Sequence, residues 1–167
     1  MQAGIKFSLT SKHVSLPTSP GFDADLQKFL GVCRVVNGIR GVRLGAVGAR
    51  PGAFNTVRYS EKILERHGIS VTTVDLSEIL GKATKMDANA AAVKAKLAEI
   101  TGYAPAPGVP SEKLLQMAKM GVVLTDWMDA NYLDATAIQC WTSVQETYGC
   151  NVCTLMCMMS EKSMPSA

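Results

Sequence analysis

Residues 42–75, VRLGAVGARPGAFNTVRYSEKILERHGISVTTVD, contain two short apolar runs with a helical pattern between them. The first run, residues 42–47, has glycine at both ends, and the second, residues 69–74, is rich in β-branched residues. The helical pattern stops at His67-Gly68, where glycine suits the C-terminal cap of a helix. About thirty residues is the size of one right-handed strand–helix–strand unit. The stretch therefore predicts two parallel strands.

The rest of the chain continues this alternation. Helical spacing predicts a helix that Asp23 caps and that ends at Gly38, and further helices over residues 86–100 and 111–131. Residues 135–141 form a third strand-like run. Residues 150–159 fit either a strand or a buried helix, because periodicity does not separate the two. The pattern predicts an α/β three-layer sandwich, Rossmann- or flavodoxin-like, in which a mostly parallel sheet has helices on both faces.

We expect residues 1–21 to be a lead-in segment and residues 22–167 to be one central α/β domain. Ile5, Phe7 and Leu9 alternate with polar residues as in a short strand, and Pro17 and Pro20 then interrupt the segment. A chain of 167 residues with 47% hydrophobic content is long enough for one packed core.

Composition narrows the functional classes. Seventeen basic and fourteen acidic residues leave a net charge of +3 without a basic stripe, so we expect no nucleic-acid partner. No apolar run approaches the ~20 residues of a membrane helix, and we expect no membrane partner. Five cysteines is an odd number, and no signal-peptide core precedes them. The expected location is the reducing cytoplasm.

The first candidate site is the loop of residues 48–55, GARPGAFN, which follows the first strand. Ligands of parallel sheets collect at the carboxyl ends of strands, where Arg50 and a helix start near Asn55-Thr56 could hold an anion or a sugar hydroxyl. The glycine spacing differs from the dinucleotide and Walker motifs, which disfavours NAD and ATP. The alternative is a tight glycine turn with Arg50 as a surface charge.

The second candidate site lies at the end of the third strand. Gln139 and Trp141 would share one face there, and an amide beside an indole suits a sugar. The alternative is a core tryptophan next to a satisfied amide.

The third candidate is the cysteine series Cys150, Cys153 and Cys157, whose spacing could hold zinc or an iron–sulfur cluster. Core packing is the alternative, because Cys153 and Cys157 would share one helical face. Cys33 is expected in the core. The carboxylates show no evident acid–base pair, and His13 and His67 are expected to be structural or solvated.

Four stretches together resemble L-fucose isomerase-like and L-arabinose isomerase-like proteins. They are residues 44–62 (LGAVGARPGAFNTVRYSEK), 137–143 (AIQCWTS), 153–161 (CTLMCMMSE) and 164–167 (MPSA). The resemblance implies a ketol isomerase that uses a divalent metal, usually Mn²⁺, to interconvert aldose and ketose through a cis-enediol. It also implies that Arg50, Gln139 and Trp141 bind the sugar.

In the resembled family the metal ligands come after the segment matched by residues 164–167, so no residue here is assigned as a catalytic residue or metal ligand. The chain is therefore interpreted as a central-domain fragment, inactive and without a bound cofactor when alone, that self-associates as a homo-oligomer. The alternative function is a non-catalytic α/β domain that binds a sugar or a phosphate.

Overall fold

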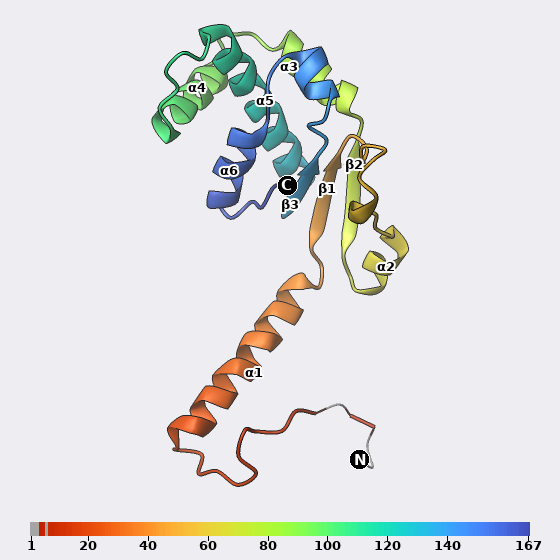
Figure 1. The fold of residues 1–167 in the computed structure, drawn as a ribbon, viewed down its shortest axis with the longest axis vertical. Helices are drawn as coiled ribbons and strands as arrows, with labels where there is room; N and C mark the ends of the chain where they lie inside the picture. Colours follow the sequence, from red (N-terminus) through yellow and green to blue (C-terminus); the bar gives the residue numbers. More distant parts are fainter. Residues whose placement is uncertain (1–3, 6) are drawn as a thin grey trace. The chain divides into compact units, whose positions relative to one another are not determined.

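The computed structural model describes residues 4, 5 and 7–167 and divides the chain into two units, which meet between Arg40 and Gly41 (Figure 1). In the first unit, the described residues before position 20 form irregular backbone with bends and a turn, and helix α1 (Pro20–Ile39) follows them. The second unit contains the sheet, the remaining helices and the core.

Helix α1 begins at Pro20, three residues before the predicted cap at Asp23. Its N-cap is Ser19, whose Oγ accepts a hydrogen bond from the Phe22 amide at 3.3 Å. Pro20 opens the helix because its missing amide proton is not needed in the first turn, and Asp23 faces the positive end of the helix dipole. Asp23 thus stabilises the first turn instead of capping it.

Two expectations for the first unit were wrong. Residues 5 and 7–9 pair with no strand, because alternation alone supplies no neighbouring backbone to bond with. Cys33 is exposed rather than in the core, and α1 has no buried residue: Leu26 is 40% exposed and Phe29 is 54% exposed. The apolar stripe of α1 was identified correctly, but none of the residues that the structure describes in this unit buries it.

The sheet consists of three parallel strands in the order β2-β1-β3. Strand β1 (Arg43–Val47) lies between β2 (Ser70–Val74) and β3 (Ala135–Ile138), with Leu44 paired to Val71 on one side and to Ala135 on the other. All three predicted strands are therefore present. The third ends at Ile138 rather than at residue 141.

The last residues of the chain extend this parallel arrangement. The Thr136 amide donates to the Pro165 carbonyl, and the Ile138 amide donates to the Ala167 carbonyl. A parallel bridge joins Thr136 to Ser166. Residues 165–167 thus lie along the free edge of β3 and reach the carboxyl end of the sheet with it.

A group of four helices covers one face of the sheet and confirms the α/β class (Figure 1). They are α3 (Leu76–Lys85), α4 (Ala91–Tyr103), α5 (Ser111–Ala130) and α6 (Cys153–Glu161). Helix α2 (Glu61–Arg66) lies beside β2 and away from this group. Two short turns complete the fold, the 3₁₀ turn η1 (Asn55–Val57) and the π-helical turn η2 (Val144–Tyr148).

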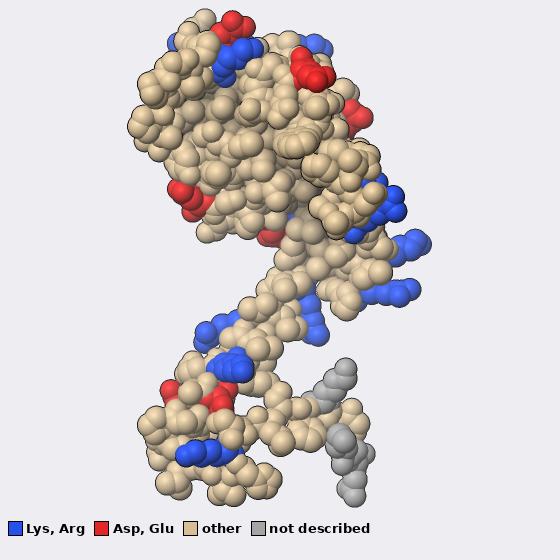
Figure 2. Space-filling view, viewed as in Figure 1, with Lys and Arg blue, Asp and Glu red and all other residues tan. Residues whose placement is uncertain are grey.

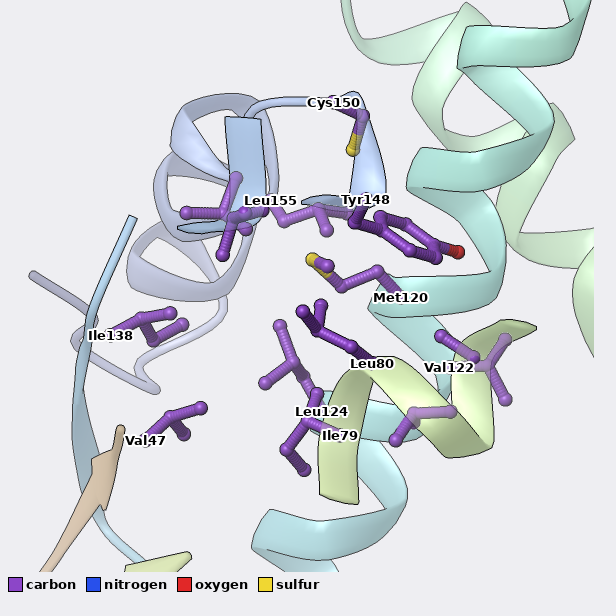
Figure 3. Packing of buried hydrophobic residues seen from close by; sticks show 14 of the residues in the cluster. Val47, Ile79, Leu80, Met120, Val122, Leu124, Ile138, Tyr148, Cys150 and Leu155 are labelled. Atoms are coloured by element: carbon purple, nitrogen blue, oxygen red, sulfur yellow. The ribbon is translucent and has the colours of Figure 1, made fainter. Parts of the chain in front are cut away.

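The core lies between the sheet and α3, α5 and α6 (Figure 3). Among its largest fully buried side chains are Ile79 of α3, Met120 and Leu124 of α5, and Val47 of β1, each at 2% exposure or less. Leu155 of α6 also packs into it. Residues 150–159, which periodicity left undecided, therefore end in a helix that buries Leu155, Met158 and Met159.

Charged side chains of both signs stand in small groups separated by broad uncharged areas on the face shown in Figure 2. Glu99 of α4 accepts from Lys96 and also from Lys162, just beyond α6, and Tyr103 donates to Glu161 at 2.9 Å. These contacts join α4 to the end of α6. In the described part of the chain, no helix combines the length and apolar character needed to cross a bilayer.

Two buried groups that can lose a proton, the Tyr148 hydroxyl and the Cys150 thiol, make the stability of the second unit dependent on pH. Burial raises the pKa of Tyr148 to about 12 and that of Cys150 to about 11, from ordinary values of 10.0 and 9.0. Both groups hold their protons more tightly when folded, so this stabilisation is complete below pH 9.0 and is lost as pH rises toward 12.

We expect the free energy of unfolding to fall above pH 9, by at most about 1.4 kcal/mol per pH unit for each group. In Cys150→Ala the fall should begin near the ordinary pKa of tyrosine, 10.0, because only Tyr148 remains. Urea unfolding between pH 7 and 11 measures this. Cys153→Ala, which removes an exposed thiol, should behave like the wild type. Identical pH profiles for all three proteins would contradict the assignment.

Candidate functional site

A cavity of about 440 Å³ opens at the carboxyl ends of β1 and β3. Its walls come from the ends of β1 and β3 and from the loops that follow them. Val57 of η1, Tyr59, Met156 of α6 and Ala167 complete the lining. The residues that line it include Arg50, Phe54, Tyr59, Gln139 and Trp141. The three residues predicted to bind a sugar therefore line one cavity, although about ninety residues separate Arg50 from Gln139.

Gln139 is held in a fixed orientation by the glycine loop. Its Oε1 accepts a hydrogen bond from the Ala49 amide at 2.8 Å, and its Nε2 donates to the Trp141 carbonyl at 3.4 Å. Gly48, at φ +78°, makes this possible, because a Cβ there would lie 2.5 Å from Oε1. With Oε1 bonded to the Ala49 amide and one Nε2 proton directed to the Trp141 carbonyl, the second Nε2 proton is the donor that Gln139 has left.

Arg50 is held by its own loop. Its Nη1 donates to the carbonyls of Pro51, Gly52 and Phe54 at 2.9, 3.1 and 3.1 Å. The Arg50 side chain is exposed, and these three bonds join its guanidinium to the turn formed by residues 51–54. The bonds use one guanidinium nitrogen, and Nε and Nη2 remain for other partners.

The Trp141 indole lies in the cavity wall against Phe54. The ring centroids are 5.4 Å apart and the ring planes are tilted by 58°, a favoured geometry for an aromatic pair. Trp141 is 54% exposed, so the alternative of a core tryptophan is wrong. β3 ends at Ile138, before Gln139 and Trp141. These two residues therefore line the same cavity because of the path of the loop, and not because they share one face of a strand.

Sequence reasoning missed two aromatic residues of the wall, Phe54 and Tyr59. Both are large, partly exposed apolar side chains, at 38% and 55%. Their position could have identified them. An aromatic residue in or just after a loop rich in glycine and proline does not belong to the buried face of a helix or strand, so another role is expected for it. The chain forms the turn η1 and then extends at Arg58, so the helix predicted to start at Asn55 or Thr56 begins only at Glu61.

Among the described residues that line the cavity, Arg50 has the only side chain charged at neutral pH. An adjoining hollow of about 340 Å³ shares Gly48, Ala49 and Gln139 and adds Asp75. Asp75 caps α3 by accepting from the Ser77 amide at 2.7 Å, and hydrogen bonds from Ser77 lower its pKa. Its carboxylate is therefore ionised and committed to the helix start.

A larger hollow of about 630 Å³ lies along β2, between α3 and α5. It contains none of the three predicted residues, and it lies beside the edge strand rather than over the ends of the central strands. We place the candidate site in the smaller cavity, because strand ends with an aromatic wall and oriented polar groups are typical of ligand sites.

The described residues do not fit a metal site. No group of three or more His, Cys, Asp or Glu side chains comes together in the part of the chain that the structure describes. Cys150 is buried, whereas Cys153 and Cys157 lie on the exposed side of α6, so the expected core role of that pair was wrong. The cysteine series therefore forms no cluster site here.

No protein-family profile matches this sequence. A curated sulfoquinovose isomerase from Clostridium sp. (strain MSTE9) is 24% identical over 145 residues, which is 85% of this chain. The chain resembles a sugar isomerase over most of its length. It spans 32% of the length of that relative. The match supports a relationship to sugar isomerases, and the narrower resemblance to L-fucose and L-arabinose isomerases stays a prediction.

Proposed function

We propose that this chain forms the sugar-holding wall of an aldose–ketose isomerase. The observation that carries the proposal is the convergence of Arg50, Gln139 and Trp141 on one cavity at the strand ends. Strand ends of a parallel sheet are where ligands bind, and the resemblance to a sugar isomerase extends over most of the chain.

The chain's own part in the reaction is to bind and orient an open-chain sugar. The Trp141–Phe54 wall offers an apolar surface to the C–H face of the sugar and excludes water from it. Gln139 donates from Nε2 to a sugar oxygen, and the Ala49 amide holds its other end. A fixed donor loses little freedom on binding, so it positions the carbons between which the proton moves.

The dependence on Mn²⁺ is part of the proposal and rests on the family resemblance alone. A bound divalent ion supplies Lewis-acid stabilisation of the enediolate in such enzymes. The described residues form no ligand cluster, so in this proposal the ligands come from elsewhere in the protein. Residues 165–167 reach the cavity along β3, and Ala167 is part of its lining.

The test is sugar interconversion by the complete polypeptide, supplied with Mn²⁺ and a panel of pentoses, deoxysugars and sulfoquinovose. We expect aldose–ketose exchange, followed by NMR as replacement of the C2 proton by deuterium. Trp141→Ala should lower kcat/KM by about tenfold, mainly through KM, because an aromatic contact of about 1.4 kcal/mol is lost.

Tyr132→Ala is the matched control, since it removes an aromatic side chain that is 77% exposed and does not line the cavity. It should leave both kinetic constants unchanged. Sugar binding without metal and without interconversion would instead support a non-catalytic binding domain. If the polypeptide neither binds nor interconverts any sugar in the panel, the proposal is wrong.

A further inference from the structure

The carbonyls of Pro51, Gly52 and Phe54 point toward one place, where Nη1 of Arg50 donates to all three. Carbonyl dipoles that converge repel one another unless a cation or donor lies between them. The Phe54 amide also donates to the Pro51 carbonyl at 3.0 Å, which closes the same turn. The turn is therefore built around the guanidinium.

Apart from these bonds and the one from the Asn55 amide to the Ala53 carbonyl, the turn has little to hold it. Gly52, Ala53 and Phe54 are all exposed, so burial of apolar side chains contributes little to its conformation. The Phe54 carbonyl is one of the three acceptors, and the Phe54 ring is the group that contacts Trp141. A change at Arg50 would therefore reach Trp141 through the backbone of Phe54.

We propose that Arg50 is a positioning residue, which sets the Phe54–Trp141 wall of the cavity and acts on a sugar through that wall. The link from Arg50 to Trp141 rests on the hydrogen bonds within the loop, and its consequence for a sugar rests on the proposed function. The two parts can be tested separately.

The first test uses the 167-residue chain labelled with 5-fluorotryptophan, in which two tryptophans give two ¹⁹F resonances that Trp141→Phe assigns. In Arg50→Ala we expect the Trp141 resonance to move toward its unfolded position, while the Trp127 resonance stays in place. Arg50→Lys should restore part of the shift, because an ammonium group carries three protons for the three carbonyls.

Arg58→Ala is the matched control. It removes the same charge from an exposed position between two residues that line the cavity, so it should leave both resonances unchanged. If Arg50→Ala leaves the Trp141 resonance unchanged, the inference is overturned. Movement of both resonances would also overturn it, since the variant would then be disturbing the fold as a whole.

The second test uses the complete polypeptide and compares a neutral hexose with an anionic one, such as a hexose phosphate. A residue that acts through the wall should lower kcat/KM for both sugars to the same extent, by about threefold to tenfold. A much larger loss for the anionic sugar would mean that Arg50 binds the anion directly and would overturn the inference. If the wild type converts no sugar, the proposed function fails, and the ¹⁹F result still decides the role of Arg50.

Discussion

Gly48→Ala is expected to lower the free energy of unfolding by about 2–4 kcal/mol and to displace Gln139 from the cavity wall. Gly48 has φ +78°, where a side chain is strained by itself. An added Cβ would also lie 2.9 Å from the Gln139 Cβ and 3.2 Å from the Leu76 Cβ. Neither of those atoms is the end of a flexible chain, so the backbone must shift.

Chemical unfolding measures the first effect, and the second appears as loss of the Ala49–Gln139 hydrogen bond in amide hydrogen exchange at Ala49. Gly52→Ala is the matched control in the same loop, because a Cβ there would meet nothing within 4 Å. It should change the free energy of unfolding by less than about 0.5 kcal/mol. Equal effects of the two substitutions would show that the constraint at Gly48 is absent.

The strands were predictable because their signal is local. The runs at residues 42–47 and 69–74 are short, apolar and closed by glycine or aspartate, and the structure places β1 and β2 in them. Asp75 then caps α3 with its own side chain. The convergence of Arg50 and Gln139 followed from the same pattern, since the ends of parallel strands lie at one edge of a sheet.

The ends of helices and strands were less predictable, because several residues near each end could act as the cap or the last residue. Ser19 rather than Asp23 caps α1, since Pro20 favours the first position of a helix. The helix expected from Asn55 is interrupted by extended backbone at Arg58, a choice that brings Val57 and Tyr59 to the cavity. This break in the helix depends on tertiary contacts, and the spacing of apolar residues along the sequence does not indicate it.

The fine structure of the site was beyond sequence reasoning. A pattern can place Arg50 in a loop, but only coordinates show that one of its nitrogens binds three carbonyls. The contact between Phe54 and Trp141 depends in the same way on the path of a loop. Periodicity describes faces of helices and strands, and neither residue belongs to one.

The second large effect is expected at the centre of the core, where Leu124→Ala should lower the free energy of unfolding by about 2–5 kcal/mol. Leu124 is 1% exposed on α5 and belongs to the core cluster of α3, α5 and the sheet (Figure 3). Removing its three outer carbons leaves a cavity that close-packed neighbours fill only in part.

Leu30→Ala makes the same change in α1, where the side chain is 37% exposed, and should cost less than about 1 kcal/mol in urea unfolding. The comparison also tests the expected domain of residues 22–167, which counts α1 together with the sheet. A loss for Leu30→Ala as large as that for Leu124→Ala would require α1 to share the core of the sheet. A small loss would place the cooperatively folding unit at residues 41–167. The reason is that an apolar side chain adds to the free energy of unfolding only to the extent that folding removes it from water.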